Sequence, residues 1–291
     1  MCDQHFEDDM KIYLDRAALT RRNFGSLAVG LGAAMLLPHV ANAVDVSETD
    51  VEVTTPDGAA DCYFVHPSSG AHAGVLIWPD ILGLRPAFRQ MGKRLATSGY
   101  SVLVVNPFYR QKRAPVVQEG ASFADEATRN IVMPLAQALS PATHVTDAKA
   151  FVAFLDSQPA VDRNRLIGTM GYCMGGPMTM RTAATVPDRI GAAASFHGGG
   201  LVTDQPDSPH LLIPGMKAQY LVAIAENDDE REPETKNVLR DEFAKAGLAA
   251  EIDVYAGAAH GWCPPDSAVY NEVQAERAWS RLLVLFDKAL G

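Results

Sequence analysis

The sequence predicts an α/β fold in which helices cover both faces of a mostly parallel, doubly wound sheet. Short apolar runs alternate with segments of helical period from residue 74 onward. Strands separated by helices of this length form parallel sheets that are covered on both faces. The chain has 291 residues and shows neither an internal repeat nor a linker. We therefore expect one folded domain over residues 44–291.

Eight short segments are expected to be strands. Val51–Val53 and Asp61–Val65 flank the turn Pro56-Asp57-Gly58 and should pair as an antiparallel edge. The remaining six are compact apolar runs of the kind that fills buried parallel strands. They are Gly74–Trp78, Ser101–Val105, Arg165–Met170, Gly191–Phe196, Tyr220–Ala225 and Ala250–Tyr255.

Helical spacing appears in the segments between these strands. Phe88, Met91 and Leu95 form one apolar stripe in the segment Pro86–Ser98, which ends at Gly99. The other expected helices are Thr143–Ser157, Pro177–Thr185, Glu234–Ala246 and Val269–Ala289. Residues 107–140 show no clear period, and we expect loops and one helix there.

Composition excludes several function classes. The net charge is −10, from 25 basic and 35 acidic residues, which argues against a nucleic-acid-binding protein. The four cysteines include no CxxC pair and no zinc-ribbon spacing, so we expect neither a structural metal nor a thiol redox protein. Whether Cys62 and Cys263 pair with each other stays open at this point, as does the oligomeric state.

The first residues resemble an export signal. The segment Thr20-Arg21-Arg22-Asn23-Phe24 precedes an apolar run, Gly25–Leu37, and the small-residue site Ala41-Asn42-Ala43 follows. This order is typical of a bacterial twin-arginine signal. We therefore expect residues 1–43 to engage the twin-arginine export machinery and to be removed. The mature chain would be periplasmic or secreted, with no stable membrane association.

The sharpest motif is Gly171-Tyr172-Cys173-Met174-Gly175-Gly176, between an expected strand and an expected helix. It fits the nucleophile elbow of the α/β-hydrolase fold, in which a strained turn lifts the nucleophile above the sheet. Glycines two residues before and after leave room for the close backbone approach. Cys173 would be the nucleophile at a helix N-terminus, where the helix dipole favours a thiolate. The N–H of Met174 would stabilise an oxyanion.

An acid and a histidine follow the elbow in the order that the fold uses. The acidic loop after Tyr220–Ala225 offers Asp228, with Asp229 as the open alternative. The loop after Ala250–Tyr255 offers His260, which would act as the general base and acid. His197, after another strand, is the rival histidine. All these loops follow strand ends, where ligands bind in open α/β sheets.

From Gly74 onward the chain resembles the dienelactone hydrolase (carboxymethylenebutenolidase) family. The resemblance rests on the cysteine elbow, on Pro79-Asp80-Ile81-Leu82-Gly83-Leu84, on the acidic loop and on His260. It implies a Cys-Asp-His triad of Cys173, Asp228 and His260.

The resemblance also implies roles for residues around the triad. A second oxyanion N–H would come from Ile81, and Asp80 stands where the family has a glutamate that helps to activate the thiol. Arg110 is similar to an arginine that holds the substrate carboxylate. No arginine follows His260, which indicates a different or less anionic substrate. Two interpretations of Trp262 stay open: it lines an apolar pocket, or it is a packed aromatic residue.

The sequence thus predicts a hydrolase that cleaves a small ester, lactone or dienelactone through an acyl-enzyme, with no cofactor. The alternative is a non-catalytic periplasmic protein that binds a small molecule in the same pocket. A serine nucleophile at Ser195 is disfavoured, because that residue lies inside an expected strand rather than on an elbow.

Overall fold

The computed structural model describes residues 37–38 and 43–291 of the chain. The predicted export signal, residues 1–43, lies outside the described residues except for Leu37, Pro38 and Ala43, so it stays a prediction. None of the helices in the described segments has the length and apolar character that a bilayer crossing requires.

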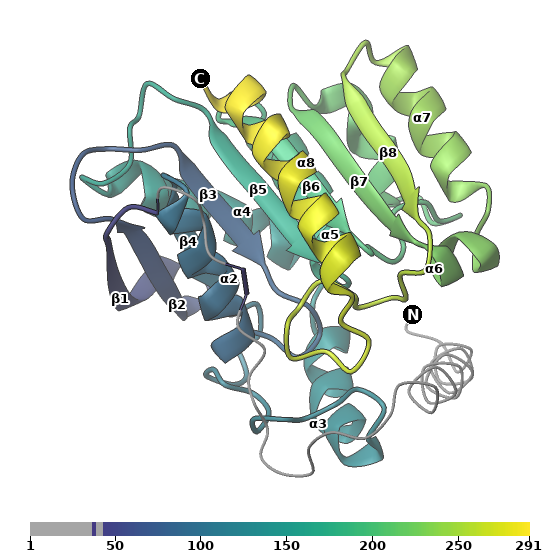
Figure 1. Ribbon diagram of the computed structural model, residues 1–291, viewed down its shortest axis with the longest axis horizontal. Helices are drawn as coiled ribbons and strands as arrows, with labels where there is room; N and C mark the ends of the chain where they lie inside the picture. Colours follow the sequence, from purple (N-terminus) through teal and green to yellow (C-terminus); the bar gives the residue numbers. More distant parts are fainter. Residues whose placement is uncertain (1–36, 39–42) are drawn as a thin grey trace.

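Within the described residues, eight strands form one sheet in the order β1-β2-β4-β3-β5-β6-β7-β8 (Figure 1). β2 pairs antiparallel with β1 and β4, and all the other neighbours are parallel. The bounds are β1 Val46–Thr55, β2 Gly58–Pro67, β3 Gly74–Trp78, β4 Ser101–Val105, β5 Ile167–Tyr172, β6 Ile190–Phe196, β7 Gln219–Ala225 and β8 Ala250–Tyr255. The predicted fold class and the antiparallel edge are confirmed.

The edge hairpin is longer than predicted. β1 and β2 each have ten residues, and Thr55 pairs with Gly58 across the turn, where Gly58 has φ 134°. Exposed acidic residues alternate along β1, which is half-open to solvent. An edge strand with so many charges lacks the apolar run that predicts buried strands, and for this reason the prediction was too short.

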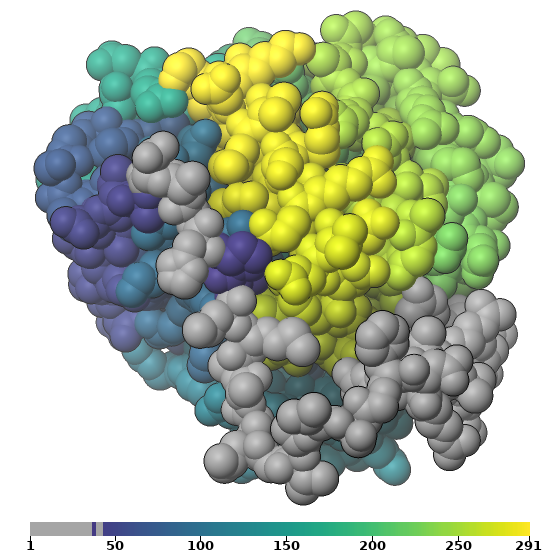
Figure 2. Space-filling model, viewed as in Figure 1, coloured from purple at the N-terminus to yellow at the C-terminus, as the bar shows by residue number. Residues whose placement is uncertain are grey.

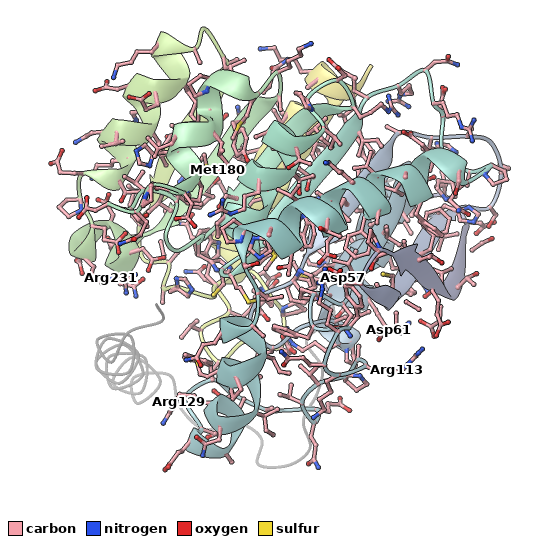
Figure 3. All side chains as sticks on the ribbon, turned by 180° about the vertical axis from the view of Figure 1, so that it is seen from behind. Asp57, Asp61, Arg113, Arg129, Met180 and Arg231 are labelled. Atoms are coloured by element: carbon pink, nitrogen blue, oxygen red, sulfur yellow. The ribbon has the colours of Figure 1, made fainter. Side chains whose placement is uncertain are left out.

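Helices cover the two faces of the sheet in two sets. One face carries α2 (Pro86–Thr97) and α8 (Glu272–Leu290), and α8 crosses the middle of that face in Figure 2. The opposite face, seen in Figure 3, carries α4 (Pro141–Ser157), α5 (Gly175–Thr185) and α7 (Thr235–Lys245). Alternate residues of β3 feed the two cores: Leu76 belongs to one and Ile77 to the other.

Two elements differ from the sequence prediction. The acidic segment after β7, expected as a loop, forms the short helix α6 (Glu226–Arg231). Carboxylates in the first turn of a helix interact favourably with the helix dipole, so an acidic run is compatible with helix at this position. A 3₁₀ helix, Pro209–Gly215, was not predicted.

The expected helix within residues 107–140 is α3 (Glu126–Gln137), which lies apart from the sheet, beyond the carboxyl ends of its parallel strands (Figure 1). From β3, successive connections lead first to β4 on one side and then to β5 on the other. This reversal is the position at which open α/β sheets bind ligands. It places the loops after β3 and β5 side by side, at the end of the sheet where α3 lies.

Candidate active site

Cys173 occupies the turn between β5 and α5 in a left-handed backbone conformation, with φ 51°. Its N–H donates to the carbonyl oxygen of Phe196 (3.0 Å), and its own carbonyl accepts from the N–H of Gly176 (3.0 Å). A non-glycine residue held at positive φ is uncommon and strained, and such residues cluster at functional sites. The geometry is that of a nucleophile elbow.

Two glycines make the elbow possible. A Cβ atom on Gly171 would lie 2.2 Å from the carbonyl oxygen of Gly175, and one on Gly175 would lie 2.4 Å from that of Trp78. Both partners are backbone atoms, which cannot move aside cheaply. The second contact packs the elbow directly against the carboxyl end of β3. The loop that follows β3 contains Ile81, which lines the same cavity as Met174.

His260 and Asp228 lie close enough to act as a unit. The ring atom Nδ1 of His260 is 2.8 Å from Oδ2 of Asp228. The backbone N–H of His260 donates to Oδ1 of Asn227 (2.9 Å). Asp229 points elsewhere and pairs with Lys236. The structure therefore brings Asp228 rather than Asp229 to His260.

The electrostatics of His260 reflect these neighbours. Burial acts to lower its pKa, but the carboxylate of Asp228 and the sulfur of Cys173 act together against it. The net direction is a pKa well above the ordinary value for histidine. Cys173 contributes both through its charge and through a side-chain hydrogen bond, so it lies within reach of the imidazole. The three predicted triad residues are thus neighbours in the fold.

His197, the rival histidine, lies beside this group. Its ring centroid is 5.1 Å from that of His260, and its backbone has φ 40°. Burial, with a smaller effect of His260, holds the pKa of His197 well below its ordinary value. Its ring nitrogens have no hydrogen-bond partner among the described residues, whereas His260 bonds to Asp228. His197 packs against the ring of His260 and makes no hydrogen bond to Asp228 among the described residues.

The other candidate nucleophiles are buried. Cys62 and Cys263 are free thiols, which answers the question of their pairing, and burial raises the pKa of each. Ser195 lies in β6 with no exposed surface. Cys173 alone of these four lines the cavity described next.

A cavity of about 560 Å³ opens at the elbow. Among the predicted site residues, Cys173, His260, Met174, Ile81 and Asp80 line it. Its size is within the range of about 300–1,000 Å³ that is usual for small-molecule sites. The elbow therefore faces a hollow large enough for a small molecule.

Asp80 belongs to an ion-pair network centred on Arg85. Both of its oxygens accept from Arg85 (2.7 and 2.9 Å), and Oδ1 also accepts from the N–H of Leu82 (2.9 Å). Arg85 in turn binds both oxygens of Asp266 (2.7 and 3.0 Å). Asp80 and Arg85 are close in sequence but lie in a loop without a periodic signal, and Asp266 is too distant in sequence to be inferred.

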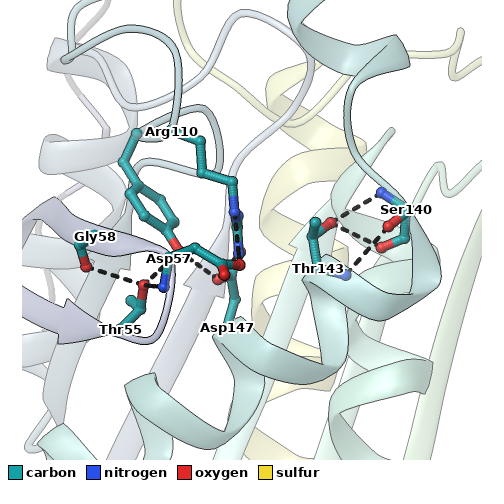
Figure 4. A network of polar contacts seen from close by, with 8 residues as sticks. Thr55, Asp57, Gly58, Arg110, Ser140, Thr143 and Asp147 are labelled. Atoms are coloured by element: carbon teal, nitrogen blue, oxygen red, sulfur yellow. Dashed lines mark hydrogen bonds and ion pairs between the residues drawn. The ribbon is translucent and has the colours of Figure 1, made fainter.

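Two predicted substrate-binding residues are not brought to the cavity. Arg110 forms ion pairs with Asp57 and with buried Asp147, in the network of Figure 4. Trp262 is fully buried, stacked on Tyr255, and does not line the cavity. Arg110 is held by its carboxylate partners and Trp262 by the aromatic core, so this geometry does not support a substrate-binding role for either residue.

The comparisons with known proteins agree on one family. The profile of the dienelactone hydrolase family matches residues 60–290. A protein of Methylorubrum extorquens, provisionally named a carboxymethylenebutenolidase, is 25% identical over 95% of this chain and 96% of its own length. The carboxymethylenebutenolidase of Rhodococcus opacus is 24% identical over 78% of this chain and 86% of its own.

Solved structures show the same fold. A dienelactone hydrolase-like promiscuous phosphotriesterase from metagenomic libraries has a TM-score of 0.70 at 22% identity, over 84% of this chain and 99% of its own. The dienelactone hydrolase of Anabaena variabilis has a TM-score of 0.60 at 17% identity, with the same coverage of both chains. At these identities the structural likeness establishes the fold alone.

Proposed function

The chain belongs to the dienelactone hydrolase family and is a lactone or ester hydrolase, and from this premise we propose that Cys173, His260 and Asp228 form its catalytic triad. The observation that carries the proposal is the cysteine on a strained elbow beside a histidine that is bonded to an aspartate. The triad is recognised by such geometry and by the roles of its groups.

The reaction follows from these positions. The thiol proton of Cys173 is first transferred to His260, in keeping with the raised pKa of that imidazole, and the sulfur then attacks the ester carbonyl carbon. The N–H groups of Met174 and Ile81 stabilise the oxyanion. The carbon–oxygen bond then breaks, and His260 returns the proton to the leaving alcohol. In a lactone this alcohol stays attached to the acyl group.

Water completes the cycle. His260 takes a proton from a water molecule whose oxygen attacks the thioester carbonyl carbon. The carbon–sulfur bond then breaks, the carboxylic acid product leaves, and His260 returns the proton to the sulfur of Cys173. Asp228 holds the imidazole in the tautomer whose Nδ1–H faces the carboxylate and stabilises the imidazolium that forms at each step.

Replacing the nucleophile tests the proposal. We expect Cys173→Ala to lower ester turnover by at least about a thousandfold, because no other group on the elbow can form the acyl-enzyme. The matched control is Cys62→Ala, which removes a buried thiol that does not line the cavity and should keep most of the activity. Steady-state hydrolysis of para-nitrophenyl acetate measures both.

The same variants separate catalysis from mere binding. A non-catalytic binding protein would show no turnover in the wild type, and iodoacetamide would not label Cys173 preferentially at neutral pH. Unchanged turnover in Cys173→Ala would overturn the proposed nucleophile. The family assignment does not favour the binding-protein alternative.

A further inference from the structure

One wall of the active-site cavity is apolar and comes largely from the segment between β4 and α4. The residues of this apolar wall belong to one hydrophobic cluster, around Phe108 and Val132. They are Ile81, Leu82, Ala121, Phe123, Ala136, Leu139 and Met174. The wall thus combines residues of α3 and its flanking loops with the elbow and with the loop after β3. A substrate group that lies against it loses water without gaining a polar partner.

The charged groups around the cavity are paired among themselves. Arg85 binds the carboxylates of Asp80 and Asp266. Arg231 binds Asp228 at 3.1 Å and lies 3.8 Å from a carboxylate oxygen of Glu232. Both arginines of the lining therefore already have carboxylate partners. A guanidinium that already holds carboxylates on its fork is a poor receptor for another.

The balance of charge also disfavours an anion. Apart from the proposed triad, the described cavity lining holds the three carboxylates of Asp80, Glu232 and Asp266 against two arginines. Burial, then the charges of Arg181 and Arg110, lowers the pKa of His144 to about 4, so this histidine adds no positive charge at neutral pH. His197 is likewise neutral. A carboxylate that entered would lose hydration without gaining a free cation.

We propose that this cavity selects uncharged esters or lactones whose apolar part lies against the apolar wall, and that it discriminates against substrates that carry a carboxylate. This inference rests on the proposed function, because it names the substrate class of the same site. It separates this chain from hydrolases of the family that hold an anionic substrate with arginines. Arg110, the residue suggested for that role here, is engaged outside the cavity by Asp57 and Asp147.

A matched pair of esters tests the charge selection. The anionic member is mono-para-nitrophenyl adipate, and the neutral member replaces its distal carboxylate by an isopropyl group of similar shape. We expect the neutral ester to have a kcat/KM at least about tenfold higher in the wild type. We also expect Cys173→Ala to bind the neutral ester more tightly by a similar factor, measured by calorimetry, which does not depend on turnover.

A pair of variants, one in the last turn of α3 and one at its C-cap, tests the apolar wall. Ala136→Trp fills part of the cavity, whereas Ala138→Trp adds the same side chain at an exposed position two residues on that does not line it. Selectivity is measured as the kcat/KM of the neutral long-chain ester divided by the kcat/KM of para-nitrophenyl acetate. We expect Ala136→Trp to lower this selectivity ratio by about tenfold or more. The Ala138→Trp control should keep the wild-type ratio.

The outcomes distinguish the two proposals. Equal or preferred use of the anionic ester, or equal binding of the two esters by Cys173→Ala, would overturn the substrate class while leaving the triad intact. Absence of turnover of every ester in the wild type would overturn the proposed function, and the binding comparison would still decide whether the cavity prefers an uncharged ligand. An unchanged ratio in Ala136→Trp would show that the apolar wall does not contact the substrate.

Discussion

His260 illustrates how neighbouring side chains decide whether a buried imidazole is protonated. Burial acts to lower its pKa, but Asp228 and Cys173 raise it by more in sum. A folded-state pKa above the unfolded one means that folding takes up a proton. The resulting stabilisation is fully present below the unfolded pKa of about 6.5 and is lost as the pH rises through the folded pKa.

Asp228→Asn should lower the pKa of His260. The substitution keeps the shape of the side chain but removes its charge, so burial opposes protonation with less compensation. We expect the pKa of His260 to fall below its wild-type value, measured by NMR titration of isotope-labelled histidine. Below this pKa, the free energy of unfolding should then be lower than in the wild type. The reason is that proton uptake by His260 stabilises the folded variant less.

Asp229→Asn provides the control for this titration. Asp229 is the adjacent residue and pairs with Lys236 instead of His260. Its replacement should leave the midpoint of His260 close to the wild-type value. A midpoint in Asp228→Asn equal to the wild-type one would contradict the account of the His260 charge.

The sequence named the three residues of the proposed triad, with Asp228 favoured and Asp229 left open within the acidic run. The order of nucleophile, acid and histidine, each after a strand, was enough to name Cys173 and His260. The choice of Asp228 over Asp229 depends on α6, which was not predicted. In a helix, adjacent side chains point in directions about 100° apart, so only one of the two can face His260.

At the scale of elements, a polar network joins the edge hairpin to α4 (Figure 4). Asp147 of α4 accepts from the hydroxyl of Tyr109 (2.8 Å) and from Arg110 (2.7 and 2.9 Å). The Tyr109 hydroxyl is also 2.7 Å from Oγ1 of Thr55 at the end of β1. Burial raises the pKa of Asp147, and its bonds to Arg110 and Tyr109 oppose this effect. The network therefore depends on Arg110 to keep the carboxylate charged.

Arg110→Met should thus cost stability and leave catalysis nearly unchanged. Removal of one partner of a buried ion pair leaves an uncompensated carboxylate, and we expect a loss on the order of 3 kcal/mol in urea unfolding. Since Arg110 does not line the cavity, KM for the neutral esters should stay within about twofold of wild type.

Arg113→Met is the matched control, because Arg113 pairs with Glu52 on the exposed surface and should contribute little. A large rise in KM for Arg110→Met without loss of stability would restore the role suggested by the family resemblance. The partners of Arg110 could not be inferred from sequence, since Asp57 and Asp147 are distant along the chain and meet only through the sheet topology.

At the scale of the whole molecule, the parts that could be predicted are those with a periodic signal. Each strand of the parallel sheet is a short apolar run, and its neighbouring helices show a regular stripe. The segment from residue 107 to 140 lacks both signals, because its apolar residues form a separate cluster and part of the cavity wall. The segment that limits prediction is therefore also the one to which we assign substrate selection.

The same segment should be the least stable part of the described fold. The helix α3 buries Thr128, Val132 and Leu135, and both apolar residues belong to the small cluster rather than the two main cores. Pro134 removes one backbone hydrogen bond from the helix, and the N-cap residue Asp125 makes no capping bond through its side chain. By contrast, every residue of the central strands β5 and β6 is buried.

We therefore expect α3 to open locally while the sheet remains folded. Hydrogen–deuterium exchange followed by mass spectrometry should show amides of α3 exchanging at least about a hundredfold faster than those of β5, with little dependence on low concentrations of denaturant. The control is α4, which begins with a capping box of Ser140 and Thr143 and lies on the main core. Its central amides should exchange nearly as slowly as the sheet. Exchange of α3 at the rate of β5 would mean that the cavity wall unfolds only with the whole domain. In that case substrate entry would require a path that leaves α3 closed.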